Sequence, residues 1–108
     1  MVPTRLERLP QLGAGSRVTV YVATSRRARL LGLAGLTAMP PWSALLLPRC
    51  SSVHTFGMRF AIGVLFLDEE MRVIGERRAV PPGRVVWQRG ARAVVEFQAA
   101  EPTSPASR

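Results

Sequence analysis

A short segment of the chain contains its single histidine together with a threonine, a glycine and an arginine: His54, Thr55, Gly57 and Arg59. A histidine can act as a general base or bind a ligand, and an arginine can bind a carboxylate or phosphate through two hydrogen bonds. A glycine inside a strand often marks the close approach of a ligand or of another backbone. We therefore predict that these four residues bind a small anionic or polar ligand.

Each of these residues also has a purely structural interpretation. His54 can hydrogen-bond a backbone carbonyl, and Arg59 can cap a strand or pair with Glu76 at the surface. Cys50 lies about 13 Å from His54 along an extended strand, too far for a Cys–His pair unless the chain bends back between them. We predict an ordinary half-buried cysteine and no catalytic residues, and an enzyme that uses His54 remains an alternative.

The sequence offers few ligands for a metal or a cofactor. One His and one Cys leave a zinc site short of strong ligands. The chain has no glycine-rich phosphate loop, no paired-carboxylate motif and no nucleophile elbow. We therefore predict neither a metal nor a cofactor.

The chain is strongly basic, with 15 Lys and Arg residues against 7 acids and a net charge of +8. All the basic residues are arginines, which suit phosphate and carboxylate groups and raise the hypothesis of a polyanionic partner. A GC-rich genome would give the same preference for arginine codons, and the arginines are spread along the chain instead of forming a block. Nucleic acid is therefore a partner that the sequence does not favour.

No targeting or membrane segment is expected. The first fifteen residues contain no apolar stretch behind their arginines, and the most apolar region, Leu30–Leu47, is interrupted by glycines and by Pro40 and Pro41. A membrane span needs about 20 predominantly apolar residues. With a single cysteine and no need for an oxidising compartment, the expected location is the cytoplasm.

Short apolar runs separated by Gly and Pro predict a compact, mainly β domain of the sandwich or barrel type, with one short helix after the first strand. The helix is expected over Arg26–Leu33 with Thr24 or Ser25 as its N-cap. Two arginines in its first turn oppose the helix dipole, so they are either tolerated there or serve something outside the helix. The expected strands are Arg17–Ala23, Ser43–Leu47, Ser52–Phe60, Ile62–Leu67, Met71–Val80, Arg84–Gln88 and Ala93–Ala99.

The length of 108 residues indicates one domain. We predict that it spans residues 16–100, preceded by a loose arm over residues 1–15 and followed by a disordered tail over residues 101–108.

Several runs between about Val18 and Ala99 form one recognisable pattern: Arg27–Arg29 with Gly32-Leu33, Ala44–Leu47, Ser52–Phe56, Met58–Phe60, Val64–Asp68, Arg72–Ile74 and Ala93–Glu96. This pattern resembles the DUF192 (UPF0127) family, a group of small bacterial and archaeal domains with no settled activity. The resemblance implies a small, mainly β domain with one short helix. Relatives have Pro, Ile and Asp after the Phe, where this chain has Ala61, Ile62 and Gly63, and they have a Gly where this chain has Ala100, so it resembles a divergent member.

Four functions fit these observations. The first is a non-enzymatic binding module with an anion-accepting pocket around the Ser52–Arg59 strand. The second is an accessory protein that binds a protein partner through a sheet edge, for which Arg84–Gln88 is the candidate. The third is nonspecific nucleic-acid binding through the arginines, and the fourth is an enzyme acting through His54. The missing acid at position 63 weakens the enzyme hypothesis most.

Overall fold

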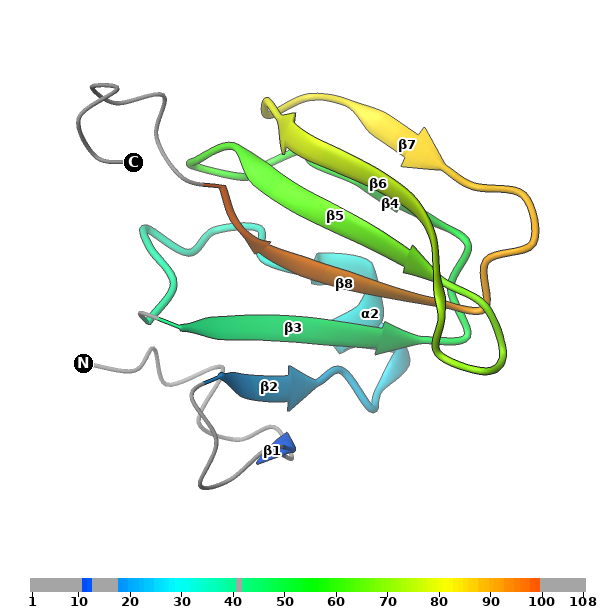
Figure 1. Cartoon of the computed structure of the whole chain (residues 1–108). Coiled ribbons are helices and arrows are strands. Elements are labelled where there is room, and N and C mark those ends of the chain that lie inside the picture. The colour runs from blue at the N-terminus through cyan, green and yellow to red at the C-terminus, as the bar shows by residue number, and fades with distance from the viewer. Residues whose placement is uncertain (1–10, 13–17, 41, 100–108) are drawn as a thin grey trace, which may run out of the picture.

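The computed structural model describes residues 11–12, 18–40 and 42–99. It contains a six-stranded sheet, a two-stranded sheet and one short helix (Figure 1). The prediction of a mainly β fold with one helix is therefore confirmed.

In the large sheet, strands that follow one another in the sequence are not always neighbours in space. From one edge to the other it runs β1 (Gln11–Leu12), β2 (Thr19–Val22), β3 (Ser43–Pro48), β8 (Ala93–Gln98), β5 (Ile62–Leu67) and β6 (Val73–Val80). β2 and β3 are parallel, and all other neighbours in this sheet are antiparallel. The small sheet pairs β4 (Ser52–His54) with β7 (Val85–Trp87) in antiparallel fashion.

Burial along the strands follows their place in the sheet. β5 is buried at every position except Leu65, and β3 is buried from Ala44 to Leu47, as expected for apolar runs in central strands. β6, at the edge, is mostly exposed and has charged residues. The most apolar of these strands therefore lie inside the sheet, and the charged strand lies at its edge.

Helix α2 (Arg26–Leu31) forms the crossover between the parallel strands β2 and β3. The Ser25 hydroxyl caps it by accepting a hydrogen bond of 2.9 Å from the Ala28 N–H, as the sequence predicted. The helix ends two residues before the predicted limit because Gly32 adopts a positive φ of 54°, which terminates the helical backbone.

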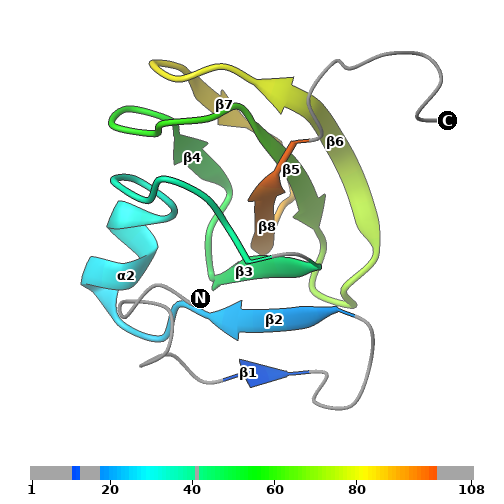
Figure 2. The same cartoon turned by 90° about the vertical axis from the view of Figure 1, so that its left-hand side faces the viewer.

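α2 and the small sheet lie on one face of the large sheet (Figure 2). The main core fills the space between them, and its largest fully buried apolar side chains are Phe66, Leu33, Leu45, Leu47 and Ile62. The opposite face has a smaller cluster of Leu46, Leu67 and Ala93. None of the helices in the described residues is long and apolar enough to cross a membrane.

The predicted strand Ser52–Phe60 is wrong in its second half. β4 ends at His54, and the chain then turns at Phe56 and Gly57, where Gly57 has a φ of +78°. In a continuous strand His54, Phe56, Met58 and Phe60 would share one face, but Phe56 is 54% exposed, whereas Met58 is 5% exposed. Gly57 is the physical reason, because this left-handed conformation is open to glycine and costly for other residues.

The predicted N-terminal arm and C-terminal tail lie largely outside the described residues. Within the arm, Gln11–Leu12 form β1 and pair with Val20 and Tyr21 of β2. Residues 1–10, 13–17 and 100–108 are not among those described.

Candidate functional site

A cavity of about 340 Å³ opens where α2 and the small sheet meet β8. Its walls come from four parts of the chain that are distant in sequence. The lining residues are Arg26, Arg29, Gly32, Cys50, Ser52, Val53, His54, Val85 and Glu96. We call this space the α2–β8 cavity, and its volume falls at the lower end of the range for small-molecule sites, about 300–1,000 Å³.

Glu96 is the most deeply buried charged group that lines the cavity. It lies in the middle of β8, opposite Leu45 of β3 and Val64 of β5, and only 1% of it is exposed. An ionised carboxylate in such a place costs several kcal/mol unless nearby charges or hydrogen bonds compensate it. Among the acids that the structure describes, Glu96 is therefore the only buried one, since Asp68, Glu69, Glu70 and Glu76 are exposed or partly exposed.

Gly32 lets the end of α2 approach this carboxylate. A Cβ atom built on Gly32 would lie 2.7 Å from Oε1 of Glu96, closer than such contacts occur. Its positive φ of 54° is a second reason why glycine suits this position. The close packing of Gly32 against Glu96 fixes the inner end of the cavity.

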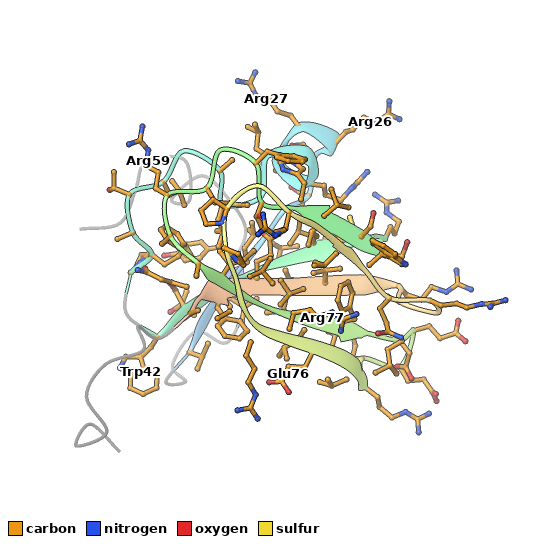
Figure 3. All side chains as sticks on the ribbon, turned by 90° about the horizontal axis from the view of Figure 1, so that it is seen from above. Arg26, Arg27, Trp42, Arg59, Glu76 and Arg77 are labelled. Atoms are coloured by element: carbon orange, nitrogen blue, oxygen red, sulfur yellow. The ribbon has the colours of Figure 1, made fainter. Side chains whose placement is uncertain are left out.

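Two arginines of α2 line the same cavity. Arg26 and Arg29 are three residues apart and therefore share one side of the helix, and both belong to the cavity wall. Arg26 is exposed, and Arg29 is partly buried. Arg26 and Arg27 leave the helix in different directions (Figure 3), and Arg27 is not among the lining residues. Arg26, whose charge opposes the helix dipole in the first turn, is thus one of the residues that line the cavity.

His54 enters the cavity wall from the end of β4. Its Nδ1 accepts a hydrogen bond of 3.1 Å from the Phe56 N–H, and the two rings stack with centroids 5.6 Å apart. In the neutral imidazole the proton is then assigned to Nε2, because Nδ1 acts as the acceptor. The turn after β4 therefore fixes both the orientation and the tautomer of this ring.

Cys50 lies in the wall near the buried carboxylate. Burial raises the pKa of the Cys50 thiol, Arg29 opposes this shift, and Glu96 adds to it. A raised pKa keeps the thiol protonated at neutral pH, and only the thiolate is a good nucleophile. Arg29 and Glu96 therefore both lie close enough to Cys50 to influence the pKa of its thiol, in opposite directions.

Of the four residues predicted from the sequence, only His54 lines this cavity. Thr55 is fully buried, and its hydroxyl donates to the Pro81 carbonyl and accepts from the Arg84 N–H, each at 2.7 Å. The Gly57 carbonyl accepts a hydrogen bond of 2.9 Å from the Gly35 N–H, so the close approach at this glycine is that of another backbone segment.

Arg59 is exposed and extends outward from its loop, apart from Arg26 and Arg27 (Figure 3). Its suggested partner Glu76 lies instead 3.9 Å from Arg78 in an exposed ion pair. Gly63, where the family resemblance led us to expect an acid, packs against the Phe97 ring. Because Phe97 and Glu96 are adjacent in β8, position 63 faces the side of the sheet opposite to Glu96.

Sequence reasoning did not place Glu96, Arg26 or Arg29 at a ligand site, although it noted that the arginines in the first turn of the helix could serve something outside it. The signal for Glu96 is its position within the apolar run Ala93–Gln98, where an acid at a core-facing position is unusual. Within the described residues, no cluster of three or more His, Cys, Asp or Glu residues could hold a metal ion.

Comparison with known proteins settles the family. The family model described as "DUF192: Uncharacterized ACR, COG1430" matches residues 9–103. The chain belongs to the DUF192 family. Comparison with curated proteins gives no match.

Two solved structures resemble this DUF192 protein. A protein of unknown function from Novosphingobium aromaticivorans DSM 12444 is 15% identical with a TM-score of 0.68, and the match covers 83% of this chain and 71% of the other. A protein of Sinorhizobium meliloti 1021, described as a proposed transcription regulator, is 19% identical with a TM-score of 0.70, covering 82% and 77% of the two chains. At these identities the likeness establishes a shared fold.

Proposed function

We propose that this DUF192 protein is a non-enzymatic binding module that accepts a small anionic molecule in the α2–β8 cavity. The observation that carries the proposal is the cavity itself, which brings Arg26 and Arg29 of α2 together with His54 of β4. Guanidinium groups bind carboxylates and phosphates through paired, charge-assisted hydrogen bonds. An anion held at this place would explain why a short helix begins with arginines.

The state of the two reactive side chains supports binding over catalysis. His54 uses Nδ1 within its own turn, and the pKa of the Cys50 thiol is raised by burial. Neither is therefore arranged as an activated nucleophile or as its base. In this proposal Thr55 and Gly57 act indirectly, by holding the turn that positions His54, and Arg59 does not contact the ligand.

The remaining arginines give less support to a continuous nucleic-acid surface. Arg77 lies with its Cζ atom 5.3 Å from the centroid of the Phe66 ring and donates a hydrogen bond to the Trp87 carbonyl. Its neighbour Arg78 is paired with Glu76. These two adjacent arginines therefore make different contacts, and a localised anion site accounts better for the arrangement at α2.

The proposal is tested by titrating the labelled protein with inorganic phosphate and acetate and following the amide NMR signals. We expect shifts centred on Arg26–Gly32 and Ser52–His54. Arg29→Gln should weaken binding of the probe by about 10- to 100-fold, since a hydrogen bond to a charged group contributes about 1.5–3 kcal/mol. Arg59→Gln, which removes an exposed arginine outside the cavity, is the matched control and should leave the affinity unchanged.

Equal losses in the two variants would show that the anions respond to net charge alone. Shifts spread over many exposed arginines that disappear with added salt would point instead to nonspecific polyanion binding.

A further inference from the structure

We propose that the ligand of the α2–β8 cavity carries a flat aromatic ring next to its anionic group, and that this ring rests on the solvent-facing side of the small sheet. This inference rests on the proposed function and adds the chemical class of the ligand. The juxtaposition that carries it is an exposed aromatic and apolar surface, formed by Phe56, Val85 and Trp87, beside a cavity lined by Arg26 and Arg29.

The small sheet has one face in the core and one face in solvent. Its antiparallel strands pair His54 with Val85 and Ser52 with Trp87. Directly paired residues share a face, as do residues two positions apart in a strand. Val53, on the other face, is 8% exposed and belongs to the core, whereas Val85 and Trp87 are 51% and 65% exposed. We call the two residue pairs the outer face of the small sheet.

The outer face of the small sheet is continuous with the α2–β8 cavity. Ser52, His54 and Val85 line the cavity, and Trp87 stands directly opposite Ser52. In an antiparallel pair the Cβ atoms of such residues lie about 4.5–5.5 Å apart. Trp87 is therefore adjacent to the cavity wall, and a ligand seated in the cavity can extend onto this face.

Phe56 adds a second aromatic side chain beside the outer face. Its ring stacks on the His54 ring, with centroids 5.6 Å apart and 21° between the ring planes, a spacing that aromatic pairs prefer. More than half of Phe56 nevertheless remains exposed, at 54%. The exposed parts of Phe56 and Trp87 thus offer ring surfaces next to the cavity.

The composition of this surface selects the class of ligand. Exposed apolar patches with polar surroundings often mark binding sites, and aromatic side chains gain stacking energy from a planar ring beyond the burial of area alone. Arg26 and Arg29 remain charged at any physiological pH, so they attract an anionic group. The fitting class is an aromatic ring linked to a phosphate or carboxylate, a chemistry that nucleotides and aryl acids share.

The test measures the binding of matched probe pairs to the full chain by calorimetry. The members of a pair share an anionic group and differ in the ring: benzoate with acetate, phenyl phosphate with methyl phosphate, and adenosine monophosphate with ribose phosphate. In at least one pair we expect the ring-bearing member to bind about tenfold or more tightly, the scale of one base–aromatic stacking contact. The pair with the largest preference distinguishes an aryl acid from a nucleotide.

Two variants connect this preference to the proposed surface. Phe56→Leu and Trp87→Leu each replace an exposed aromatic ring by an aliphatic side chain. At least one of them should bring the affinity for the ring-bearing probe down toward that of its ring-free partner, with the affinity for the ring-free partner unchanged. The matched control is Trp42→Leu, because Trp42 is also exposed, at 70%, and lies away from Arg26 (Figure 3). This variant should change neither affinity.

The outcomes separate this inference from the proposed function. Equal binding within every pair would refute the aromatic ligand, leave the anion site in place and point to a protein partner for the exposed surface. A ring preference that survives in both variants would also refute it, because the ring would then bind elsewhere. If no carboxylate or phosphate probe binds, the proposed function itself fails. The comparison of pairs uses the wild-type protein, so it decides the question even if a variant does not fold.

Discussion

At the scale of single residues, the segment that the sequence marks as functional divides into two roles. His54 lines the cavity, whereas Thr55 ties the end of β4 to the loop between β6 and β7. The same few residues therefore contain one candidate ligand contact and the hydrogen bonds that hold it in place. The sequence of this segment alone does not distinguish a residue that lines the cavity from one that only stabilises the turn.

The structural role of Thr55 predicts a loss of stability on Thr55→Val. The substitution keeps the side-chain shape but removes the hydroxyl that bonds Pro81 and Arg84. Because the Arg84 N–H would lose this acceptor, we expect the free energy of unfolding to fall by about 1–3 kcal/mol, measured by urea denaturation. Thr37→Val, at an exposed position, should change it by less than about 0.5 kcal/mol. Equal effects of the two substitutions would contradict this role.

The raised pKa of Cys50 predicts slow alkylation at neutral pH. The folded protein should react with iodoacetamide more slowly at pH 7 than the chain unfolded in urea, because burial raises the thiol pKa and lowers the thiolate fraction. The rate should rise with pH until the thiol is ionised. The chain has one cysteine, so mass spectrometry follows a single reaction. A folded protein that reacts faster than the unfolded chain at pH 7 would indicate an activated thiol.

At the scale of elements, the loop between β5 and β6 is organised by one side chain. Oδ1 of Asp68 accepts hydrogen bonds from the backbone N–H groups of Glu70 and Arg72, at 2.8 and 2.9 Å. Met71 in the same loop has a φ of +66°, a left-handed conformation that costs a non-glycine residue energy. These bonds explain how the turn between β5 and β6 closes without a glycine.

The carboxylate of Asp68 makes the stability of this hairpin depend on pH. The hydrogen bond from the Arg72 backbone is the largest cause that lowers its pKa below the ordinary value. A depressed pKa contributes stability that is present above the unfolded-state value, about 3.9, and that is lost as the pH falls through the lower folded-state value.

We therefore expect Asp68→Asn to lower the melting temperature at pH 6, with a difference from wild type that shrinks as the pH falls below about 4. Glu69→Gln, on the adjacent exposed residue, is the control and should not reproduce this pattern. Melting curves by circular dichroism measure both. A difference that stays constant down to pH 2 would mean that the Asp68 charge is not involved.

At the scale of the whole molecule, the sequence predicts those features that depend on neighbouring residues along the chain, such as strand limits and helix caps. The limits of β5 agree with the apolar run Ile62–Leu67, and Ser25 caps α2 as its hydroxyl predicts. The α2–β8 cavity could not be predicted in this way, because Arg29 and Glu96 line one cavity only after β8 has paired with both β3 and β5. Similarly, the alternation rule failed after His54 because a single backbone turn at Gly57 outweighed the side-chain pattern.

The position of β8 has a consequence for how the protein is made. β8 is the last strand of the described chain, yet it lies between β3 and β5 in the sheet (Figure 1). Until the ribosome has released residues 93–98, β3 and β5 each keep an unpaired edge that can join the wrong strand. Glu96 arrives with this strand, so a nascent chain has no inner end to its cavity. The α2–β8 cavity is therefore complete only once β8 has joined the sheet.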